Sequence, residues 1–532
     1  MRKILTSLVA VLTITSVQAQ MDVPETPKLV IGITIDQLRG DYLNFFQGNF
    51  GEKGFKRLMR EGVVYQNMVF DFPQVNDASA LSTIYTGANP SYSGINGNEK
   101  YIPETGLIGS VFSDNTYLGN YTQEKYSPLA LRVSTIGDEL KIASQGRSDV
   151  YSFAPNANQA LITAGKDANC AFWVENYSGK WATTTYYKDF HWIVDQANRS
   201  DTSYSRRIGS LVWKPLLALD KYKSFPYTSN IYNFRHTFGS DKNSYLLFKE
   251  SPFVNEDVTN TALALIDKAA LGKRVFPDFV SLTYYAGNYS KSMDKTYSIE
   301  LQDTYCRLDK EIAKLLDGVD KTVGLKNVLF FVTSTGYYQA EEQDIDLNSK
   351  PVIFYPNRCE SLLNMYLMAI YGREQWVEGF FNNQLFLNRK LIENKNINLK
   401  EIQQKAAEFV AQFTGVQDVA TYYQLLLGEE NSNMSAYRNL LNKATSGDIF
   451  IELQPGVKVV NESQTTTVTG KNYQVRNTAI VSPVFFFGYD IKPQKISRTI
   501  NAREIAPTVS YILRIRSPNA SSSNVLNELI RF

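Results

Sequence analysis

Three uninterrupted apolar runs are the clearest pattern along this chain. They cover residues 28–35, 279–283 and 328–333, and the first ends at Asp36. Apolar runs without polar alternation are typical of strands buried on both faces of a parallel sheet. Residues 298–316 carry apolar side chains at helical spacing between the second and third runs. Strand, helix and strand in this order predict a βαβ unit, and therefore an α/β fold.

The remaining segments suggest the domain organisation. Residues 55–62 have helical spacing and end in Gly62, and residues 484–488 predict a further strand. Residues 151–275 are rich in Tyr, Trp, Ser and Asn and lack regular alternation, which predicts an inserted cap region. The mature chain of about 510 residues is too long for one simple core, so a large domain with a smaller insertion is expected. The core would comprise residues 20–150 and 276–532, with the cap region inserted between them.

The N-terminus has the features of a secretory signal peptide at residues 1–19. Arg2 and Lys3 precede a mostly apolar segment, and Val17 and Ala19 place small residues at a cleavage site. A membrane anchor is the alternative, but the apolar segment is too short to span a bilayer comfortably. No later apolar run of about 18 residues follows. We therefore expect a periplasmic or secreted protein without a transmembrane segment in the mature chain.

Composition excludes some partners and leaves others open. The chain has 55 Lys and Arg against 53 Asp and Glu, without a basic block, which argues against a nucleic-acid partner. Aromatic residues make up 13% of the chain, which suits either a Tyr-rich core or an aromatic binding face. Cys170, Cys306 and Cys359 have no CxxC spacing, so no thiolate zinc site is predicted.

Several short motifs resemble, in order, those of a known enzyme family. The family is the type I phosphodiesterase/nucleotide pyrophosphatase branch of the alkaline phosphatase superfamily, in its secreted bacterial form. The matching segments are residues 33–42, 54–58, 84–87, 94–98, 171–173, 376–391 and 505–508. The resemblance covers nearly the whole mature chain. It implies a three-layer α/β sandwich with a largely parallel central sheet.

The resemblance also implies a two-zinc phosphatase site, of which little remains here. In working members six side chains hold the metals, and a Thr or Ser between them attacks phosphorus. Asp36 matches the first ligand. The nucleophile position falls on Asp77, although a shift of one or two residues would offer Ser79 or Ser82.

The other ligand positions of the family carry different residue types in this chain. They are occupied by Tyr284, Asn288, Thr335, Gly336 and Val481. Neutral hydroxyls, an amide, glycine and valine cannot replace imidazole and carboxylate as zinc ligands. The chain has only two histidines, His191 and His236, and both lie outside these motifs.

The positions that contact phosphate in the family follow the same trend. A Lys-x-Arg pair of the family becomes Asn156 and Asn158, whereas Asn98 is kept. Losing both cations removes the charge clamp on the transferred group.

The retained polar residues also have structural explanations. Asp36 can cap the turn after its strand, Asn98 can fix a turn, and Asp77 can cap a helix that runs through Tyr85. Two uncompensated carboxylates in one cleft would repel each other. We therefore predict that Asp77 caps its own helix and that Tyr284 or Tyr285 fills part of the metal space.

The substitutions predict a pseudoenzyme that acts as a binding or scaffold protein without a cofactor. The signal peptide predicts that this protein is exported. Its partner would be an envelope protein or a small ligand of unknown identity. The alternative is a divergent metal-dependent hydrolase of phosphate or sulfate esters, with zinc held at Asp36 and Asp77.

Overall fold

The computed structural model describes residues 25–103, 105–188, 190–224, 231–239, 243–294, 298–338, 352–428, 432–461, 473–475 and 480–530. The predicted signal peptide, residues 1–19, lies outside these ranges. Among the described residues, no helix is both long and apolar enough to cross a membrane.

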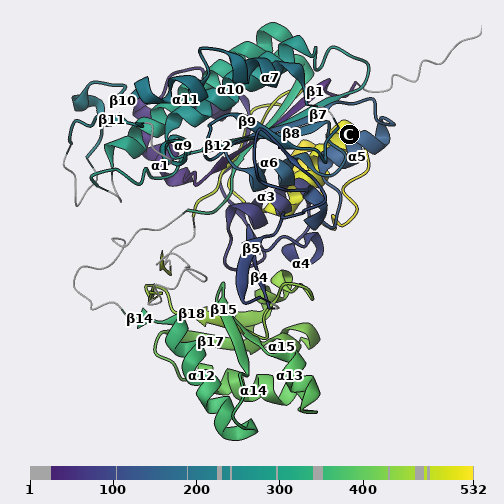
Figure 1. Ribbon diagram of the computed structural model, residues 1–532. Helices are drawn as coiled ribbons and strands as arrows, with labels where there is room; N and C mark the ends of the chain where they lie inside the picture. The colour runs from purple at the N-terminus through teal and green to yellow at the C-terminus, as the bar shows by residue number, and fades with distance from the viewer. Residues whose placement is uncertain are drawn as a thin grey trace, which may run out of the picture.

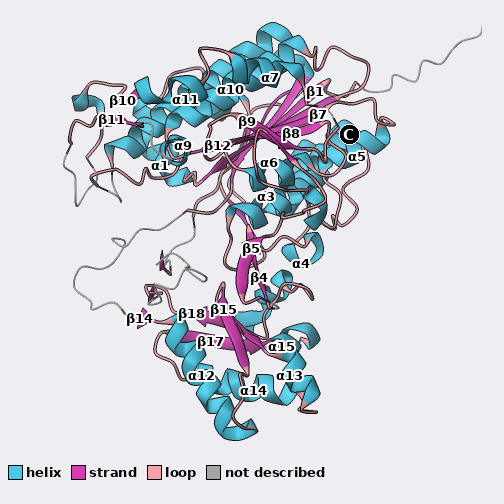
Figure 2. Ribbon diagram, viewed as in Figure 1, coloured by secondary structure: helices cyan, strands magenta, loops and turns pink. Residues whose placement is uncertain are grey.

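A ten-stranded sheet forms the centre of the larger lobe (Figures 1 and 2). The strands lie in the order β22 (Gln494–Ile496), β2 (Val63–Tyr65), β21 (Val484–Gly488), β13 (Val328–Ser334), β1 (Leu29–Asp36), β12 (Asp278–Tyr285), β7 (Val150–Ala154), β8 (Cys170–Val174), β9 (Trp181–Thr184) and β6 (Gly119–Asn120). The five central strands, β13, β1, β12, β7 and β8, run parallel. All eight residues of β1 are buried, as its continuous apolar sequence predicts.

Helices cover both faces of this sheet. One layer contains α10 (Pro252–Lys268) and α11 (Ile299–Thr322), which pack on each other, with α7 (Trp192–Arg199) beside α10. The other contains α3 (Asp77–Thr86), α6 (Ala157–Ala164), α16 (Ile505–Leu513) and α5 (Ile136–Ala143). The predicted three-layer α/β sandwich with a largely parallel sheet is confirmed, and so is the βαβ unit formed by β12, α11 and β13.

The predicted cap boundary at residue 151 is wrong, because β7, β8 and β9 are strands of the central sheet. Many of the aromatic residues that suggested a cap lie in the core, although Tyr177 and Trp192 are exposed. Trp173, Trp181, Trp213 and Phe248 are buried in the same hydrophobic cluster as β1. Much of the aromatic content of residues 151–275 therefore belongs to the core of the larger lobe. The sequence has no regular alternation there, so its strands were not predicted.

A smaller lobe forms within the predicted C-terminal core segment and has its own sheet and hydrophobic cluster. Its strands lie in the order β15 (Val377–Phe381), β16 (Gln384–Leu387), β18 (Ile449–Leu453) and β17 (Val416–Thr421). Helices α12 (Pro356–Tyr371) and α14 (Leu399–Val410) cover this sheet, with α13 (Arg389–Asn394) and α15 (Tyr422–Leu427) nearby (Figure 1).

The hairpin of β4 (Glu99–Ile102) and β5 (Leu107–Ser110) reaches from the larger lobe to the smaller one (Figure 2). The Tyr101 hydroxyl donates to the Glu378 carbonyl over 2.6 Å, and its ring lies 4.6 Å from that of Phe386. A third hydrophobic cluster, which includes Phe72, Tyr437 and Phe450, also joins the lobes. This contact places the segment before α3 against the smaller lobe.

Candidate functional site

The predicted site residues gather at the carboxyl ends of the parallel strands, where open α/β sheets usually bind ligands. Asp36 is the last residue of β1, and Tyr285, the last residue of β12, is its register partner. Thr335 follows β13 directly. The backbone of β1 thus delivers the Asp36 carboxylate to this edge, where it is only 6% exposed.

Asp77 approaches Asp36 from the N-terminus of α3 and is 9% exposed. The prediction that Asp77 caps its own helix is wrong, because Asn76 is the N-cap. The Asn76 side chain accepts from the Ser79 amide over 3.0 Å, and the Ser79 hydroxyl completes the capping box. The Asp77 carboxylate is therefore free to turn into the site, and the helix N-terminus favours its negative charge.

Neither alternative nucleophile faces the site openly. Ser79 and Ser82 are both fully buried. The Ser79 hydroxyl contacts only the backbone of Asn76. Of the three candidates for the nucleophile position, Asp77 is therefore the one whose side chain lies in the site.

Side-chain amides surround the Asp77 carboxylate. Asn98 donates to one carboxylate oxygen over 2.7 Å, and Asn158 donates to the other over 3.1 Å. Asn158 also donates to the side-chain oxygen of Asn98, which links the two amides. Asn158 stands where the resemblance expects a cation, so a neutral donor has taken the place of a positive charge.

Gln159 joins the two carboxylates and was not predicted. Its side-chain nitrogen lies 3.4 Å from Asp36 Oδ2 and 3.3 Å from Asp77 Oδ2. Gln159 is 1% exposed on α6, a helix of mostly apolar sequence. One glutamine at a buried position of an apolar helix was the available signal, since buried polar groups need partners.

Asp36 is held by neutral donors as well. The Thr335 hydroxyl donates to Asp36 Oδ1 over 3.0 Å, and Gln159 approaches the other oxygen. Burial raises the pKa of Asp36 well above its ordinary value, and the Asp77 charge raises it further. The hydrogen bonds from Thr335 and Gln159 lower the pKa but do not overcome these effects.

The two tyrosines at the end of β12 point in different directions. Tyr284 was predicted to line the old pocket, but its hydroxyl lies 2.9 Å from that of Thr259 on α10. Successive side chains of a strand face opposite sides, so Tyr285 rather than Tyr284 shares the side of Asp36. The Tyr285 hydroxyl donates to the Asn288 carbonyl over 2.8 Å. Burial raises the pKa of Tyr285, and the nearby Asp36 charge contributes.

Three further predicted positions lie around this network. The Asn288 side chain donates to the Tyr338 hydroxyl over 2.9 Å. Gly336 has φ of +63°, and a Cβ there would lie 2.6 Å from the Phe70 ring, so a larger residue is disfavoured. Val481 is 41% exposed, and its carbonyl accepts from the Gly40 amide.

Asn156 connects the network to a buried lysine that the sequence reasoning missed. Its amide nitrogen lies 3.4 Å from Gln159 Oε1, and its oxygen lies 3.4 Å from the Lys249 ammonium. Burial lowers the pKa of Lys249 to about 8, although the carboxylates of Glu124 and Glu175 oppose the shift. The Lys249 ammonium is thus separated from the carboxylates of Asp36 and Asp77 by the side-chain amides of Asn156 and Gln159.

Both histidines lie outside this network, as their positions in the sequence suggested. His191 caps α7 by accepting from the Ile193 amide over 3.4 Å. The His236 ring lies 2.7 Å from Glu300 Oε1.

The donor set does not fit the zinc pair that the resemblance implies. Zinc takes thiolate, imidazole or carboxylate ligands. Here the groups that face the two carboxylates are the N–H and O–H donors of Asn98, Asn158, Gln159 and Thr335. Within the described ranges, no cluster of three or more His, Cys, Asp and Glu residues could hold a metal ion.

Comparison with known proteins identifies the family. The sequence model described as type I phosphodiesterase / nucleotide pyrophosphatase matches residues 30–479. The chain belongs to this family. The resemblance read from the short motifs is therefore confirmed.

Relatives in this family match along almost the whole chain. The chain is 30% identical to a protein of Myroides odoratus named calcium-transporting ATPase, over 95% of each protein. It is 27% identical to alkaline phosphatase PafA of Elizabethkingia meningoseptica, over 95% of this chain and 94% of that one. The crystal structure of wild-type PafA superposes with a TM-score of 0.81 at 26% identity and covers 95% of this chain and 99% of its own. The chain thus has an alkaline-phosphatase-like fold.

Proposed function

We propose that this chain is an exported member of the family that has lost two-zinc phosphoester hydrolysis and acts as a binding or scaffold protein. One observation carries the proposal. Gln159 donates to both Asp36 and Asp77, so a neutral amide occupies the bridging position between the carboxylates. A metal ion there would have to displace that amide and would find hydrogen-bond donors in place of ligands.

Electrostatics support the same conclusion. Phosphoryl transfer requires positive charge at the transferred group. The described neighbours of Asp36 and Asp77 are neutral, and Lys249 is reached only through Asn156 and Gln159. A phosphate dianion approaching this edge would meet two carboxylates without a compensating cation.

Export is part of the proposal and is supported by residues 1–19. The short apolar segment after Arg2 and Lys3, followed by Val17 and Ala19, suits a cleavable signal peptide. The partner would then be an envelope protein or a small ligand.

A divergent hydrolase of phosphate or sulfate esters is the second candidate. It is favoured by the proximity of Asp36 and Asp77, which are close enough for the Asp77 charge to raise the pKa of Asp36. Two carboxylates at one sheet edge could hold a single metal ion if the Gln159 side chain moved. Metal binding therefore separates the two candidates.

Chelation provides the test. A ligand that binds only the folded state at 1,000 times its Kd adds about 4 kcal/mol to the free energy of unfolding. We expect no such gain here, so the thermal midpoint of the mature protein should be the same in EDTA and in excess zinc. PafA, measured in parallel, serves as the comparison enzyme. A fall of several degrees on chelation that Asp36→Ala abolishes would favour the hydrolase.

A further inference from the structure

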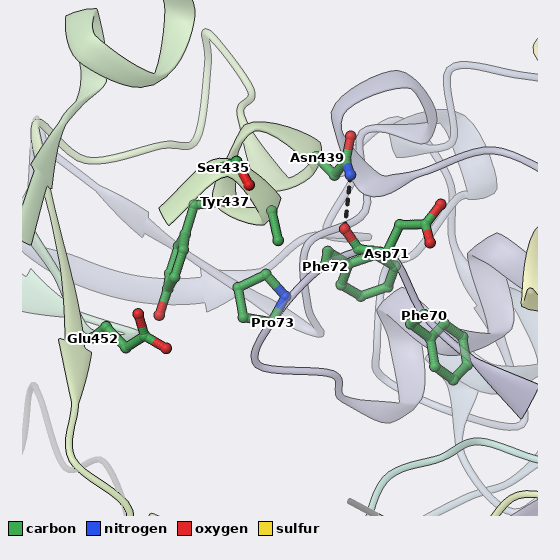
Figure 3. A pocket seen from close by; sticks show the side chains of 9 residues that line it. Phe70, Asp71, Phe72, Pro73, Ser435, Tyr437, Asn439 and Glu452 are labelled. Atoms are coloured by element: carbon green, nitrogen blue, oxygen red, sulfur yellow. Dashed lines mark hydrogen bonds between the residues drawn. The ribbon is translucent and has the colours of Figure 1, made fainter. Parts of the chain in front are cut away.

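The junction between the two lobes contains an open pocket that is separate from the carboxylate network (Figure 3). Its volume is about 560 Å³, and its lining residues are Phe70, Asp71, Phe72, Pro73, Ser435, Ala436, Tyr437, Asn439 and Glu452. This volume lies within the usual range of small-molecule sites, about 300–1,000 Å³. Its walls come from the segment before α3, from the 3-10 helix Ser432–Leu440, and from β18.

Glu452 supplies a charge that no described cation balances. The side chain is half-buried, and its Oε2 atom is buried without a hydrogen-bond partner. Leaving a buried acceptor of this kind unpaired costs free energy, about 1–3 kcal/mol and more for a charged group. The Glu452 carboxylate is therefore poorly stabilised by the surrounding protein.

A second carboxylate strengthens the negative potential at this place. Glu452 of β18 is the register partner of Asp418 on β17, and like charges directly opposite each other destabilise an antiparallel pair. Burial raises the pKa of Glu452, and the Asp418 charge raises it further. Asp418 itself accepts from the Val419 amide, and no cation among the described residues lowers the pKa of Glu452.

The other acidic residue that lines the pocket, Asp71, is already neutralised. Asp71 forms an ion pair with Arg503 and accepts from the Asn501 side chain. Its carbonyl accepts from the Asn439 side chain over 2.7 Å, which fixes this wall (Figure 3). The unbalanced charge of the pocket is therefore concentrated at Glu452.

Apolar surface lies beside this charge. Figure 3 shows the Tyr437 hydroxyl end and the Glu452 carboxylate on the same side of the pocket, with the Pro73 ring next to them. Phe72 and Tyr437 are buried at 4% and 3% exposure and belong to the cluster that joins the lobes, so these walls are held in place by packing. An aromatic face beside a carboxylate suits a cation with an apolar stem.

We propose that this pocket binds an organic cation, an ammonium or guanidinium group on an alkyl stem, with Glu452 as its counter-ion and Tyr437, Phe72 and Pro73 along the stem. The group could belong to a free amine or to a Lys or Arg side chain of a polypeptide. This site goes beyond the proposed loss of hydrolysis and does not depend on it, because none of the described side chains that hydrogen-bond to Asp36 or Asp77 lines the pocket.

Calorimetric titration of the full mature protein tests the proposal. The two probes are 1,5-diaminopentane and the blocked peptide acetyl-Gly-Arg-Gly-amide, with 1-pentanol as the neutral control. We expect saturable binding of at least one cationic probe and none of 1-pentanol. Binding of the amine alone would identify a free amine as the ligand class, and binding of the peptide alone would identify a basic polypeptide segment.

Variants distinguish binding in the pocket from nonspecific attraction of a cation to the negative charges of the protein. Glu452→Gln keeps the shape and removes the charge, and should weaken binding by about tenfold or more, since hydrogen bonds to charged groups are worth about 1.5–3 kcal/mol. Glu393→Gln, at an exposed carboxylate on α13, should bind like the wild type. Ala436→Trp should obstruct the pocket and reduce binding without a change in the charge. Absence of saturable binding to both cations, or equal binding by Glu452→Gln, would overturn the proposal.

Discussion

Purified mature protein is expected to hydrolyse neither phosphate monoesters nor phosphate diesters above the rate in buffer, with or without added zinc. Asp77 stands at the nucleophile position, and its carboxylate accepts hydrogen bonds from Asn98 and Asn158. A carboxylate held in this way repels an incoming phosphate. Removing even one well-placed donor from an active site costs about 10²–10³ in rate. Here five of the six metal ligands that the resemblance implies, and both cations, are replaced together.

The assay uses p-nitrophenyl phosphate and bis-p-nitrophenyl phosphate, with PafA as the active control. Trace contamination by a host phosphatase would give turnover that is unchanged in Asp36→Ala and Asp77→Ala. Turnover that disappears in both variants would instead show a working site, and the hydrolase reading would replace the pseudoenzyme.

The largest structural effect is expected for Gln159→Leu. This change keeps the side-chain volume but removes the shared donor between Asp36 and Asp77. Two buried carboxylates then repel each other with fewer hydrogen bonds, which should lower the free energy of unfolding by about 2–4 kcal/mol near neutral pH. Urea denaturation measures the loss.

Two further variants make this result specific. Adding Asp36→Asn to Gln159→Leu should recover part of the stability, because it removes one of the two charges. Gln404→Leu, at an exposed helical glutamine whose amide also contacts a carboxylate, should change stability by no more than about 0.5 kcal/mol.

The pH dependence of the Gln159→Leu loss follows from the pKa of Asp36. The hydrogen bond from Gln159 lowers that pKa, so the variant raises it further. The variant is destabilised only when Asp36 is charged, because the charged carboxylate is the form that loses the Gln159 hydrogen bond. Protonation of Asp36 removes this cost. The loss should therefore be largest above the raised pKa and should shrink as pH falls toward the ordinary Asp value, about 3.9. A loss of stability that is independent of pH would indicate a packing defect instead.

The middle of the central sheet was predictable because three of its strands appear in the sequence as uninterrupted apolar runs. The run that ends at Asp36 is buried along its whole length, and the helical stripe after Ser298 becomes α11. The smaller lobe and the strands β7 to β9 were not predicted. Short strands with aromatic residues such as Phe172 and Trp173 give no regular alternation. In addition, β7 joins the rest of the sheet only through β12, where Phe279 is the register partner of the distant Val150.

The candidate site was predictable only as a set of positions. The motifs placed Asp36, Asp77, Asn98, Asn158 and Thr335 in one region, and the structure brings them together. The predicted Asp77 cap was wrong, and of the two tyrosines offered for the metal space, Tyr285 rather than Tyr284 shares the side of Asp36. Strand alternation and the choice of N-cap depend on one-residue differences, which the motifs do not resolve. Gln159 could not be assigned from the motifs, since it follows Asn158 on α6 and contacts two carboxylates that lie about 80 and 120 residues away.

Metal content of the purified protein tests the central claim most directly. The mature chain would be produced in zinc-supplemented medium, dialysed against metal-free buffer and analysed by inductively coupled plasma mass spectrometry, with PafA treated in the same way. If Gln159 has taken the bridging position between Asp36 and Asp77, zinc should be far below one equivalent per chain. Two equivalents of zinc that are retained by the wild type and lost in Asp36→Ala would contradict this account.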